Sequence, residues 1–284
     1  MSALKLSNKF PSKRAFITGA GAGLGRALSL LLASDGWTIG IADISAPNVL
    51  ETKAQIEAKG GKGIEFSFDV SDKEAYKNAF DSYISQTGGI DLLINNAGVG
   101  DGGLFDEYAL KNWDWIVGIN QMAVIYGSFF AAPVMKKQGA GHIISIASAA
   151  GYANMPNMSM YNVTKASVIS FSESVYTELM PFGINVSVVM PTFFKTNIMK
   201  LGRGPEDAMA VGNAMLKKVT ILPSDVAIKI LTDAGKGKFH IFHPFQAVLV
   251  WYVKRLIPNL FMKFKLNNFK KKGWVMKKVA EARK

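Results

Sequence analysis

The chain passes from a short apolar strand, beginning at Arg14, into a helix through the stretch Thr18-Gly19-Ala20-Gly21-Ala22-Gly23-Leu24-Gly25. Apolar residues at helical spacing follow the stretch, at Leu24, Ala27, Leu28, Leu31 and Leu32. Glycines between a strand and a helix let backbone N–H groups approach a pyrophosphate at the helix N-terminus. A glycine triad alone is a weak signal, but here it stands in the required context. The stretch therefore predicts an α/β fold that holds a dinucleotide.

The alternation of strand and helix continues along the chain. Further strands are predicted over 38–42, 63–68, 91–94, 142–146, 185–190 and 238–242. The predicted helices cover 47–59, a segment starting at Ser71 with a capping box to Glu74, 110–137, 159–182, 206–218 and 224–234. Because the strands are continuously apolar, they indicate a parallel sheet covered on both faces. We expect a single doubly wound Rossmann-type domain over 1–242, with a substrate flap at about 192–218, and a helical C-terminal extension over 243–284.

Composition excludes several classes of protein. Apolar residues make up 49% of the 284 residues, which is ample for a buried core, and the chain has no cysteine for a disulfide or a thiolate nucleophile. The start lacks the apolar segment of a signal peptide. No run of about 18 apolar residues is free of charge, so we expect no spanning helix and a cytoplasmic location. The three histidines show no ligand spacing, and no metal site is predicted.

The net charge of +12 is concentrated at one end of the chain. Residues 254–284 hold 11 Lys or Arg and one acid, Glu281, while the other residues hold 22 basic and 20 acidic groups. The main domain is therefore nearly neutral. No recognition motif accompanies the basic end, so nucleic acid is not an expected partner.

Asp43 ends the second predicted strand, 18 residues after Gly25, near the ~20 expected for an acid that binds the adenosine ribose. Its carboxylate would accept hydrogen bonds from ribose hydroxyls and would repel a 2′-phosphate. No Lys or Arg follows Asp43, and Ala22 precedes Gly23. The sequence therefore predicts NAD rather than NADP.

Tyr161 and Lys165 stand four residues apart on a predicted helix, so both side chains share one face. A phenol titrates near ~10, too high for a base at neutral pH. We expect the ammonium group to stabilise the phenolate and lower the pKa of Tyr161. A tyrosine tuned in this way can exchange a proton with an alcohol oxygen.

At this point the chain resembles the short-chain dehydrogenase/reductase family over residues 14 to about 200. The residues that match its motifs are the Thr18–Gly25 turn, Asp69-Val70, Asn95-Asn96-Ala97-Gly98, Asn120, Ser148 and the pair Tyr161 and Lys165. Agreement of all six by chance is negligible. The resemblance implies an oxidoreductase that transfers a hydride between a nicotinamide cofactor and a carbinol carbon.

The resemblance also implies a role for each matching residue. Tyr161 would be the general acid or base, Ser148 would polarise the substrate carbonyl, Lys165 would bind the nicotinamide ribose, and Asn120 would hold a water linking Lys165 to solvent. The implied cofactor-binding residues are Gly19, Gly23, Leu24, Gly25, Asp43, Asp69, Val70, Asn96, Ala97, Gly98, Tyr161, Lys165, Pro191 and Thr196. Among these, Asn96, together with Asn95, is expected chiefly to hold the strand end and its turn.

Two departures from the family pattern concern the loop after the sixth strand and the C-terminus. Thr192 follows Pro191 where the family has glycine, so the loop is expected to run differently. The usual pattern of a final strand followed by a Gly-rich turn is missing, and 239–244 with about 40 further residues stands in its place. This puts a homotetramer in doubt but leaves a homodimer, through the helices near 110–137 and 159–182, as expected.

Soft apolar residues gather near Tyr161 and in the predicted flap, and they favour a lipophilic, fairly bulky alcohol or ketone as substrate. They are Met155, Met158, Met160, Met190, Met199, Met209 and Met215, with Tyr152, Phe193, Phe194 and Leu201. Ordinary core packing remains the alternative for about half of the methionines.

The C-terminal extension interleaves aromatic residues, among them Phe245, Trp251, Phe264 and Trp274, with Lys and Arg, and Pro258 divides it into two helices. Such a segment can bind weakly to a membrane surface. The alternative is a helix packed on the domain and a solvated basic end. At the level of function, an epimerase or dehydratase on the same fold and a non-enzymatic dinucleotide-binding or membrane-surface protein are the alternatives to the oxidoreductase.

Overall fold

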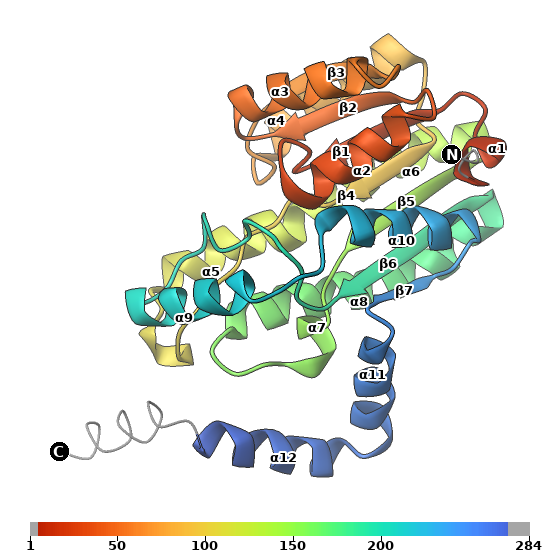
Figure 1. Ribbon diagram of the computed structural model, residues 1–284. Helices are drawn as coiled ribbons and strands as arrows, with labels where there is room; N and C mark the ends of the chain where they lie inside the picture. The colour runs from red at the N-terminus through yellow and green to blue at the C-terminus, as the bar shows by residue number, and fades with distance from the viewer. Residues whose placement is uncertain (1–4, 272–284) are drawn as a thin grey trace.

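The computed structural model describes residues 5–271 and contains one seven-stranded parallel sheet with helices on both faces (Figure 1). The strand order is β3-β2-β1-β4-β5-β6-β7, so the chain winds outward from β1 in one direction and from β4 in the other. This is the doubly wound Rossmann arrangement expected from the sequence. The strands are β1 (Arg14–Thr18), β2 (Thr38–Asp43), β3 (Lys62–Ser67), β4 (Leu92–Asn95), β5 (Gly141–Ile146), β6 (Ile184–Pro191) and β7 (His240–His243).

The helices form two layers, and each layer seals one face of the sheet with apolar side chains. One layer contains α1 (Lys5–Lys9), α2 (Gly23–Ala33), α3 (Ala46–Glu57) and α10 (Pro223–Gly235). The other contains α4 (Lys73–Thr87), α5 (Leu110–Val117), α6 (Ala123–Gln138) and α8 (Ser159–Leu179). Because both faces are covered, the central strands are buried throughout, which explains their continuous apolar runs.

The start of α4 differs from the expected capping box. The N-cap is Asp72, whose carboxylate accepts hydrogen bonds from the backbone N–H groups of Glu74 and Ala75, both at 3.0 Å. The hydroxyl of Ser71 instead donates to Asp69. An aspartate caps a helix as well as a serine does, so the helix begins one residue later than predicted.

The long helix predicted over 110–137 contains a π-helical turn, η2 (Gly118–Met122), between α5 and α6. Within the described part of the chain, this run, Leu110–Gln138, is long and apolar enough to cross a bilayer by composition, with a mean hydropathy of 1.3. It lies, however, against α4, α8 and strands β4 and β5 of the domain. A core helix of a folded domain therefore explains its apolar character.

Two helices extend from β7, α11 (Gln246–Leu256) and α12 (Pro258–Lys270), and we call them together the C-terminal arm. Trp251 of α11 packs at right angles against Tyr152 of the short helix α7 (Ala150–Ala153), with ring centroids 5.1 Å apart. In contrast, α12 has no buried residue. Figure 1 shows the arm below the body of the molecule, with α12 running beneath α7. The remainder of the predicted basic extension, 272–284 with Trp274, lies outside the described residues.

Two lysines of the arm form hydrogen bonds with the end of α7. Lys254 of α11 donates to the side chain of Asn154, and Lys265 of α12 donates to the backbone carbonyls of Ala153, at 2.7 Å, and Asn154. Asn154 has a φ of +51°, a left-handed conformation that asparagine tolerates and that ends α7. The arm therefore contacts the loop that leads into α8.

Candidate active site

The Gly-rich turn lies between β1 and α2, at the carboxyl end of the sheet, as the sequence predicts. Gly19 has a φ of +63°, which favours glycine. A Cβ at Gly25 would collide with the carbonyl oxygen of Gly19 and the side chain of Asn96. Glycine at these two positions therefore allows α2 to pack closely on the turn that follows β4.

Thr18 and Asn96 tie this turn to the one after β4. The hydroxyl of Thr18 accepts hydrogen bonds from the backbone N–H groups of Asn96, at 3.0 Å, and Ala97, at 3.1 Å. The Asn96 amide donates to the carbonyls of Thr18 and Gly19. Asn96 thus holds the turn, as expected, and Asn95 lies buried with its amide donating to Ser128.

Asp43 lies at the tip of β2, beside the Gly-rich turn. Its carboxylate accepts hydrogen bonds from the backbone N–H groups of Gly21, at 2.9 Å, and Ser45, at 3.0 Å. These bonds fix the acid at the carboxyl edge of the sheet, which is the place predicted for a ribose-binding group.

Arg26 is a cation that contacts this turn and that the sequence motifs do not predict. Its guanidinium donates to the carbonyl of Gly21, at 3.0 Å, and to Thr52, and it forms an ion pair with Glu51 at 2.6 Å. Arg26 lies one position after Gly25, and its partner Glu51 belongs to α3. Only the packing of α3 on α2 brings them together, so sequence spacing gave no signal. The guanidinium of Arg26, beside the turn, is therefore already engaged in an ion pair with Glu51.

The residues around the turn fit a dinucleotide. The N-terminus of α2 has no side-chain cap, so its backbone N–H groups remain available to an anion. A Cβ at Gly23 would meet nothing within 4 Å, so the turn is open beside that residue. The other predicted cofactor residues lie at the same carboxyl edge of the sheet: Leu24 in the first turn of α2, Asp69 and Val70 after β3, Gly98 after β4, Pro191 at the end of β6, and Thr196 just beyond it.

Ser148, Tyr161 and Lys165 come together at the end of β5 and the start of α8. The Lys165 ammonium lies 5.6 Å from the centroid of the Tyr161 ring and donates to the carbonyl of Ile146 at 2.9 Å. The hydroxyl of Ser148 accepts from the N–H of Ala150 and forms a hydrogen bond with Tyr161. Spacing along one helix and the end of one strand thus bring a hydroxyl, a phenol and an ammonium group together.

Burial dominates the ionisation of this group, contrary to the expectation for the phenol. Desolvation raises the pKa of Tyr161 to about 12, although the hydrogen bond with Ser148 opposes the rise. Desolvation also lowers the pKa of Lys165 to about 8. The predicted fall in the tyrosine pKa was wrong for this structure, because both charged forms lose water in the same apolar surroundings.

Asn120 lies in the π turn η2, and its side chain pairs with the backbone of Val99, just past the Asn95–Gly98 turn. Its carbonyl accepts from the Val99 N–H at 2.8 Å, and its amide donates to the Val99 carbonyl at 2.9 Å and to the Thr164 hydroxyl at 3.3 Å. A Cβ at Gly98 would lie 3.2 Å from the Asn120 carbonyl and 3.4 Å from the Lys165 ammonium. Asn120 and Lys165 therefore flank the same glycine.

Asp101 is a second residue that the sequence analysis missed. Its side chain is buried, with 2% of the residue exposed, and one carboxylate oxygen accepts from the N–H of Met160 at 3.1 Å. Desolvation raises the pKa of Asp101 to about 6, and its charge in turn raises that of Tyr161. A loop acid outside any motif gives no sequence signal for such burial.

Methionine side chains pack between the flap helix α9 (Glu206–Lys217) and the loops beside it. The sulfur of Met199 lies 2.7 Å from the position of a Cβ on Gly100, and its methyl group lies 2.8 Å from that of a Cβ on Gly212 of α9. Met209 packs on Gly202 in the same way. Met160 and Met190 are also buried, so core packing accounts for much of the methionine cluster.

Among the apolar residues predicted near the substrate, Tyr152 is placed differently. Its ring is buried against α11, and its hydroxyl donates to the carbonyl of Ala247 at 2.9 Å. Tyr161 belongs instead to an apolar cluster whose other buried members are Val99, Tyr108, Ile116, Ala150 and Met160. The prediction that Tyr152 lies near the substrate was wrong. Tyr152 is close to Tyr161 in the sequence, but it belongs to a separate short helix, α7, and packs on α11.

The loop after β6 does not need the glycine that the family pattern has there. The N–H of Thr192 donates to the carbonyl of His243 at 2.8 Å, extending the pairing of β6 with β7. Among residues 5–271, the non-glycine residues with positive φ are Lys13, Asn154 and Asn157, so Thr192 has an ordinary backbone conformation. The same part of the chain contains no group of three His, Cys, Asp or Glu side chains placed to hold a metal.

Comparison with known proteins agrees with the fold. The family described as short chain dehydrogenase matches residues 13–206. The chain belongs to this family. The structure superposes with a TM-score of 0.78 on a short chain dehydrogenase/reductase from Burkholderia phymatum solved in complex with NAD, at 31% identity over 84% of this chain and 91% of that one.

Two curated relatives show the range of the similarity. Cyclohexanol dehydrogenase from Acinetobacter sp. is 32% identical over 195 residues, 68% of this chain and 78% of its own. The probable oxidoreductase EphD from Mycobacterium tuberculosis is 35% identical over 185 residues, 64% of this chain. The matched segment is only 31% of the length of EphD. These relatives carry different names, so membership of the family does not by itself define the reaction of this chain.

Proposed function

We propose that the protein is an NAD-dependent oxidoreductase that interconverts a lipophilic, fairly bulky secondary alcohol and its ketone. The observation that carries the proposal is the group of half-buried Ser148 and buried Tyr161 and Lys165 beside an open Gly-rich turn. A relative of similar length is named for cyclohexanol, a cyclic secondary alcohol, and this supports the proposed class of substrate. The apolar surroundings of Tyr161 support it independently.

In ketone reduction, the Tyr161 phenol donates its proton to the carbonyl oxygen, while the Ser148 hydroxyl donates a hydrogen bond to the same oxygen. In alcohol oxidation, the Tyr161 phenolate accepts the hydroxyl proton. NAD, when bound, supplies the hydride acceptor for oxidation and, in its reduced form, the hydride donor for reduction. Lys165 would bind the ribose of the cofactor, and Asn120 would position the water that connects Lys165 to solvent.

The proposed preference for NAD rests on Asp43 and on Arg26. The carboxylate of Asp43 is fixed beside the turn by two backbone N–H groups, and it would repel a 2′-phosphate. The guanidinium of Arg26 is already paired with Glu51 and is not free to neutralise that phosphate. The proposed dinucleotide contacts are those predicted from Gly19 to Thr196.

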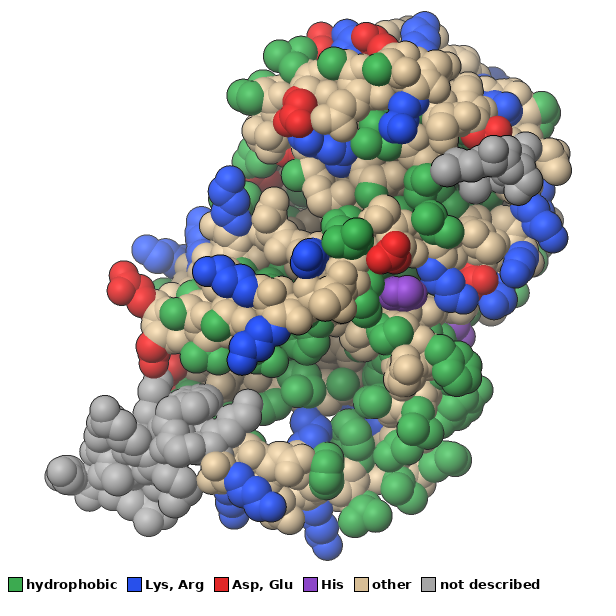
Figure 2. Space-filling view, in the orientation of Figure 1, with side chains coloured by type: hydrophobic (Ala, Val, Ile, Leu, Met, Phe, Trp, Pro, Cys, Tyr) green, Lys and Arg blue, Asp and Glu red, His purple; other side chains and the backbone are tan. Residues whose placement is uncertain are grey.

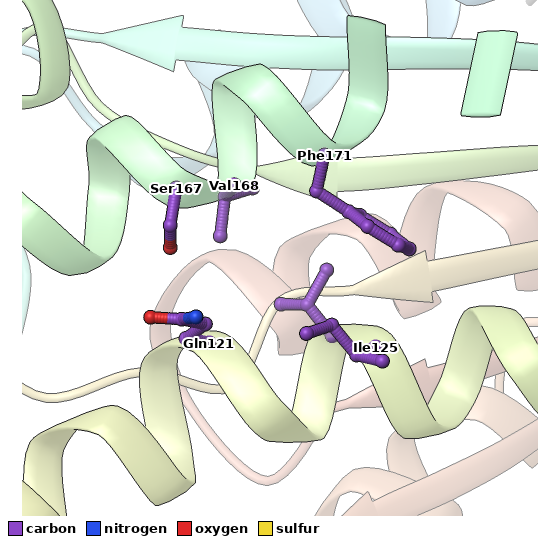
Figure 3. Close-up of a pocket in the computed structure, with 6 residues that line it drawn as sticks. Gln121, Ile125, Ser167, Val168 and Phe171 are labelled. Carbon is purple, nitrogen blue, oxygen red and sulfur yellow. The ribbon is translucent and has the colours of Figure 1, made fainter. Parts of the chain in front are cut away.

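We propose a homodimer, with a tetramer left open, formed through the helical run 110–138 and α8. Figure 3 shows Ser167, Val168 and Phe171 of α8 facing Gln121 and Ile125 across a hollow. The hollow has a volume of about 40 Å³, room for no more than a few water molecules, so it is too small for a bulky substrate. Exposed Phe129 on α6 and Val163 on α8 support an interface there. The proposed domain limits are 1–242 and 243–284, and the proposed location is the cytoplasm, peripheral to a membrane.

The test is the variant Tyr161→Phe, assayed with cyclohexanol and NAD. We expect kcat to fall by ~10²–10⁴-fold, the usual contribution of positioned proton transfer, with NAD affinity changed no more than a few-fold. Tyr176→Phe removes a hydroxyl from the same helix, where its ring packs on Phe239, and should leave kcat unchanged. Retention of more than half of the activity by Tyr161→Phe would show that another group transfers the proton.

A further inference from the structure

The C-terminal arm exposes an apolar stripe on the side of α11 that faces away from the domain. Phe245, Leu249, Tyr252 and Leu256 are separated by four, three and four residues, so they lie on one helix face. Their exposed fractions are 82%, 67%, 57% and 77%. The opposite face carries the buried residues Ala247 and Trp251. Because α11 is apolar on both faces, packing on the domain satisfies only one of them.

The exposed apolar surface continues past the stripe into α12. Ile257 lies at the corner between the helices, and α12 exposes Leu260, Met262, Phe264 and Leu266. Figure 2 shows hydrophobic side chains gathered over α11 and the corner, with Lys and Arg side chains along α12. Scattered apolar residues are normal on a surface, but a continuous patch of this kind marks an interaction site.

The charges of the arm identify the partner that fits. Its cations are Lys254, Arg255, Lys263, Lys265 and Lys270, and the sequence has no Asp or Glu between Asp233 and Glu281. Lys254 and Lys265 are bound to the end of α7, and Arg255 lies over the ring of Trp251 and pairs with Glu173. Lys263 and Lys270 are exposed to solvent. A second copy of the same face would bring like charges together, whereas an anionic surface would complement them. Exposed Phe and Leu beside those lysines favour a lipid bilayer over nucleic acid.

We propose that the C-terminal arm docks on the surface of an anionic bilayer, with the apolar stripe at the boundary between headgroups and acyl chains and with Lys263 and Lys270 at the phosphates. The 11 residues of α11 span about 16 Å, half of the ~30 Å hydrocarbon core, so the arm lies on the bilayer and does not cross it. This proposal rests on the proposed peripheral location and not on the proposed reaction.

The first test compares two pairs of exposed apolar residues by co-sedimentation with vesicles of phosphatidylcholine and phosphatidylglycerol. We expect the full chain to sediment with these vesicles and not with phosphatidylcholine alone. Leu249→Gln with Leu256→Gln should weaken binding at least ten-fold. The control, Leu50→Gln with Ile228→Gln, changes exposed residues of α3 and α10 and should bind like the original protein. All four side chains are exposed, so the fold should survive, and circular dichroism checks it.

The second test separates the arm from net charge. Lys263→Glu with Lys270→Glu should weaken binding at low salt at least ten-fold, because two cations that face the anionic surface are replaced by two acids. Lys59→Glu with Lys236→Glu changes the net charge by the same amount on exposed residues elsewhere and should bind several-fold better than the arm variant. Binding of the original protein should weaken as salt shortens the Debye length.

Three results would overturn the proposal. The first is that the original protein does not sediment with anionic vesicles at low salt, and the second is that an arm variant and its control variant lose vesicle binding equally. The third result is a smaller oligomer for the Leu249 and Leu256 variant without lipid. The last result would identify the stripe as a contact between copies of the chain. Turnover of cyclohexanol without vesicles is measured for every variant. Loss of sedimentation with intact turnover concerns the arm alone, and failure of turnover in the original protein concerns the reaction alone.

Discussion

The candidate active site and the C-terminal arm distribute polar and apolar groups in opposite ways. In the site, Asp101, Tyr161 and Lys165 are buried, and burial shifts the pKa of each one toward its neutral form. In the arm, large apolar side chains are exposed and stand beside cations. Burial of charge changes what a residue can do chemically, whereas exposure of apolar surface leaves free energy to be gained from a partner.

The largest effect should separate the two faces of α11. Trp251→Ala removes a buried ring that contacts Tyr152 and Phe242, and it should lower the free energy of unfolding by about 3–5 kcal/mol. Leu249→Ala, on the exposed stripe of the same helix, should change it by no more than about 0.5 kcal/mol. Urea unfolding in the absence of lipid measures both. Similar losses in the two variants would mean that the stripe is already covered and that the contrast between the regions fails.

A smaller effect tests whether the fixed carboxylate of Asp43 selects the cofactor. Asp43→Ser with Ile44→Arg removes the repulsion of a 2′-phosphate and adds a cation at an exposed position. The ratio of kcat/KM for NAD to that for NADP should fall at least about ten-fold, which corresponds to about 1.4 kcal/mol.

Glu51→Gln is the matched control for the cofactor experiment. It frees Arg26 from its ion pair but leaves Asp43 and the Gly21 carbonyl contact in place. Because Asp43 still repels a 2′-phosphate, the preference for NAD should fall much less in this variant than in the Asp43 variant. If the original protein used both cofactors equally well, or if Glu51→Gln alone reversed the preference, Asp43 would not be the selecting group.

The smallest effect concerns the buried charge of Asp101. Above pH 6 its carboxylate is ionised and raises the pKa of Tyr161, so Asp101→Asn should lower that pKa. Alcohol oxidation needs the phenolate, and its kcat/KM should therefore reach half of its maximum at a lower pH, by less than about one unit. Asp106→Asn removes an exposed acid nearby and should leave the profile in place. An unchanged profile for Asp101→Asn would show that the two groups do not interact.

The sequence predicted the parts of the molecule that depend on local patterns. Continuous apolar runs gave the seven parallel strands, and the glycines of 18–25 gave the turn between β1 and α2. The motif residues lie at the carboxyl edge of the sheet, because parallel strands all end there. Their chemical roles remain predictions.

Features that depend on distant packing were not predictable in this way. The π turn at Gly118–Met122 directs Asn120 toward the backbone of Val99, and no local helix preference in the sequence predicts this turn. Asp101 is buried only because the flap and α8 close around its loop. The pKa of Tyr161 rises rather than falls, since spacing along a helix gives the distance to Lys165 but not the loss of water around both groups.

The two lysines that hold Asn154 connect the arm to the reaction by thermodynamic reciprocity. Lys254 and Lys265 stabilise one conformation of the chain just before Met158 and Tyr161. If a vesicle favours a different position of α12, it also changes the free energy of that loop, and by linkage a ligand that fixes the loop must change vesicle affinity by the same factor. Titration of vesicles with and without saturating NAD and ketone measures this coupling, and equal affinities would set it at zero. The contacts at Asn154 would then hold the arm in place without affecting ligand binding at the active site.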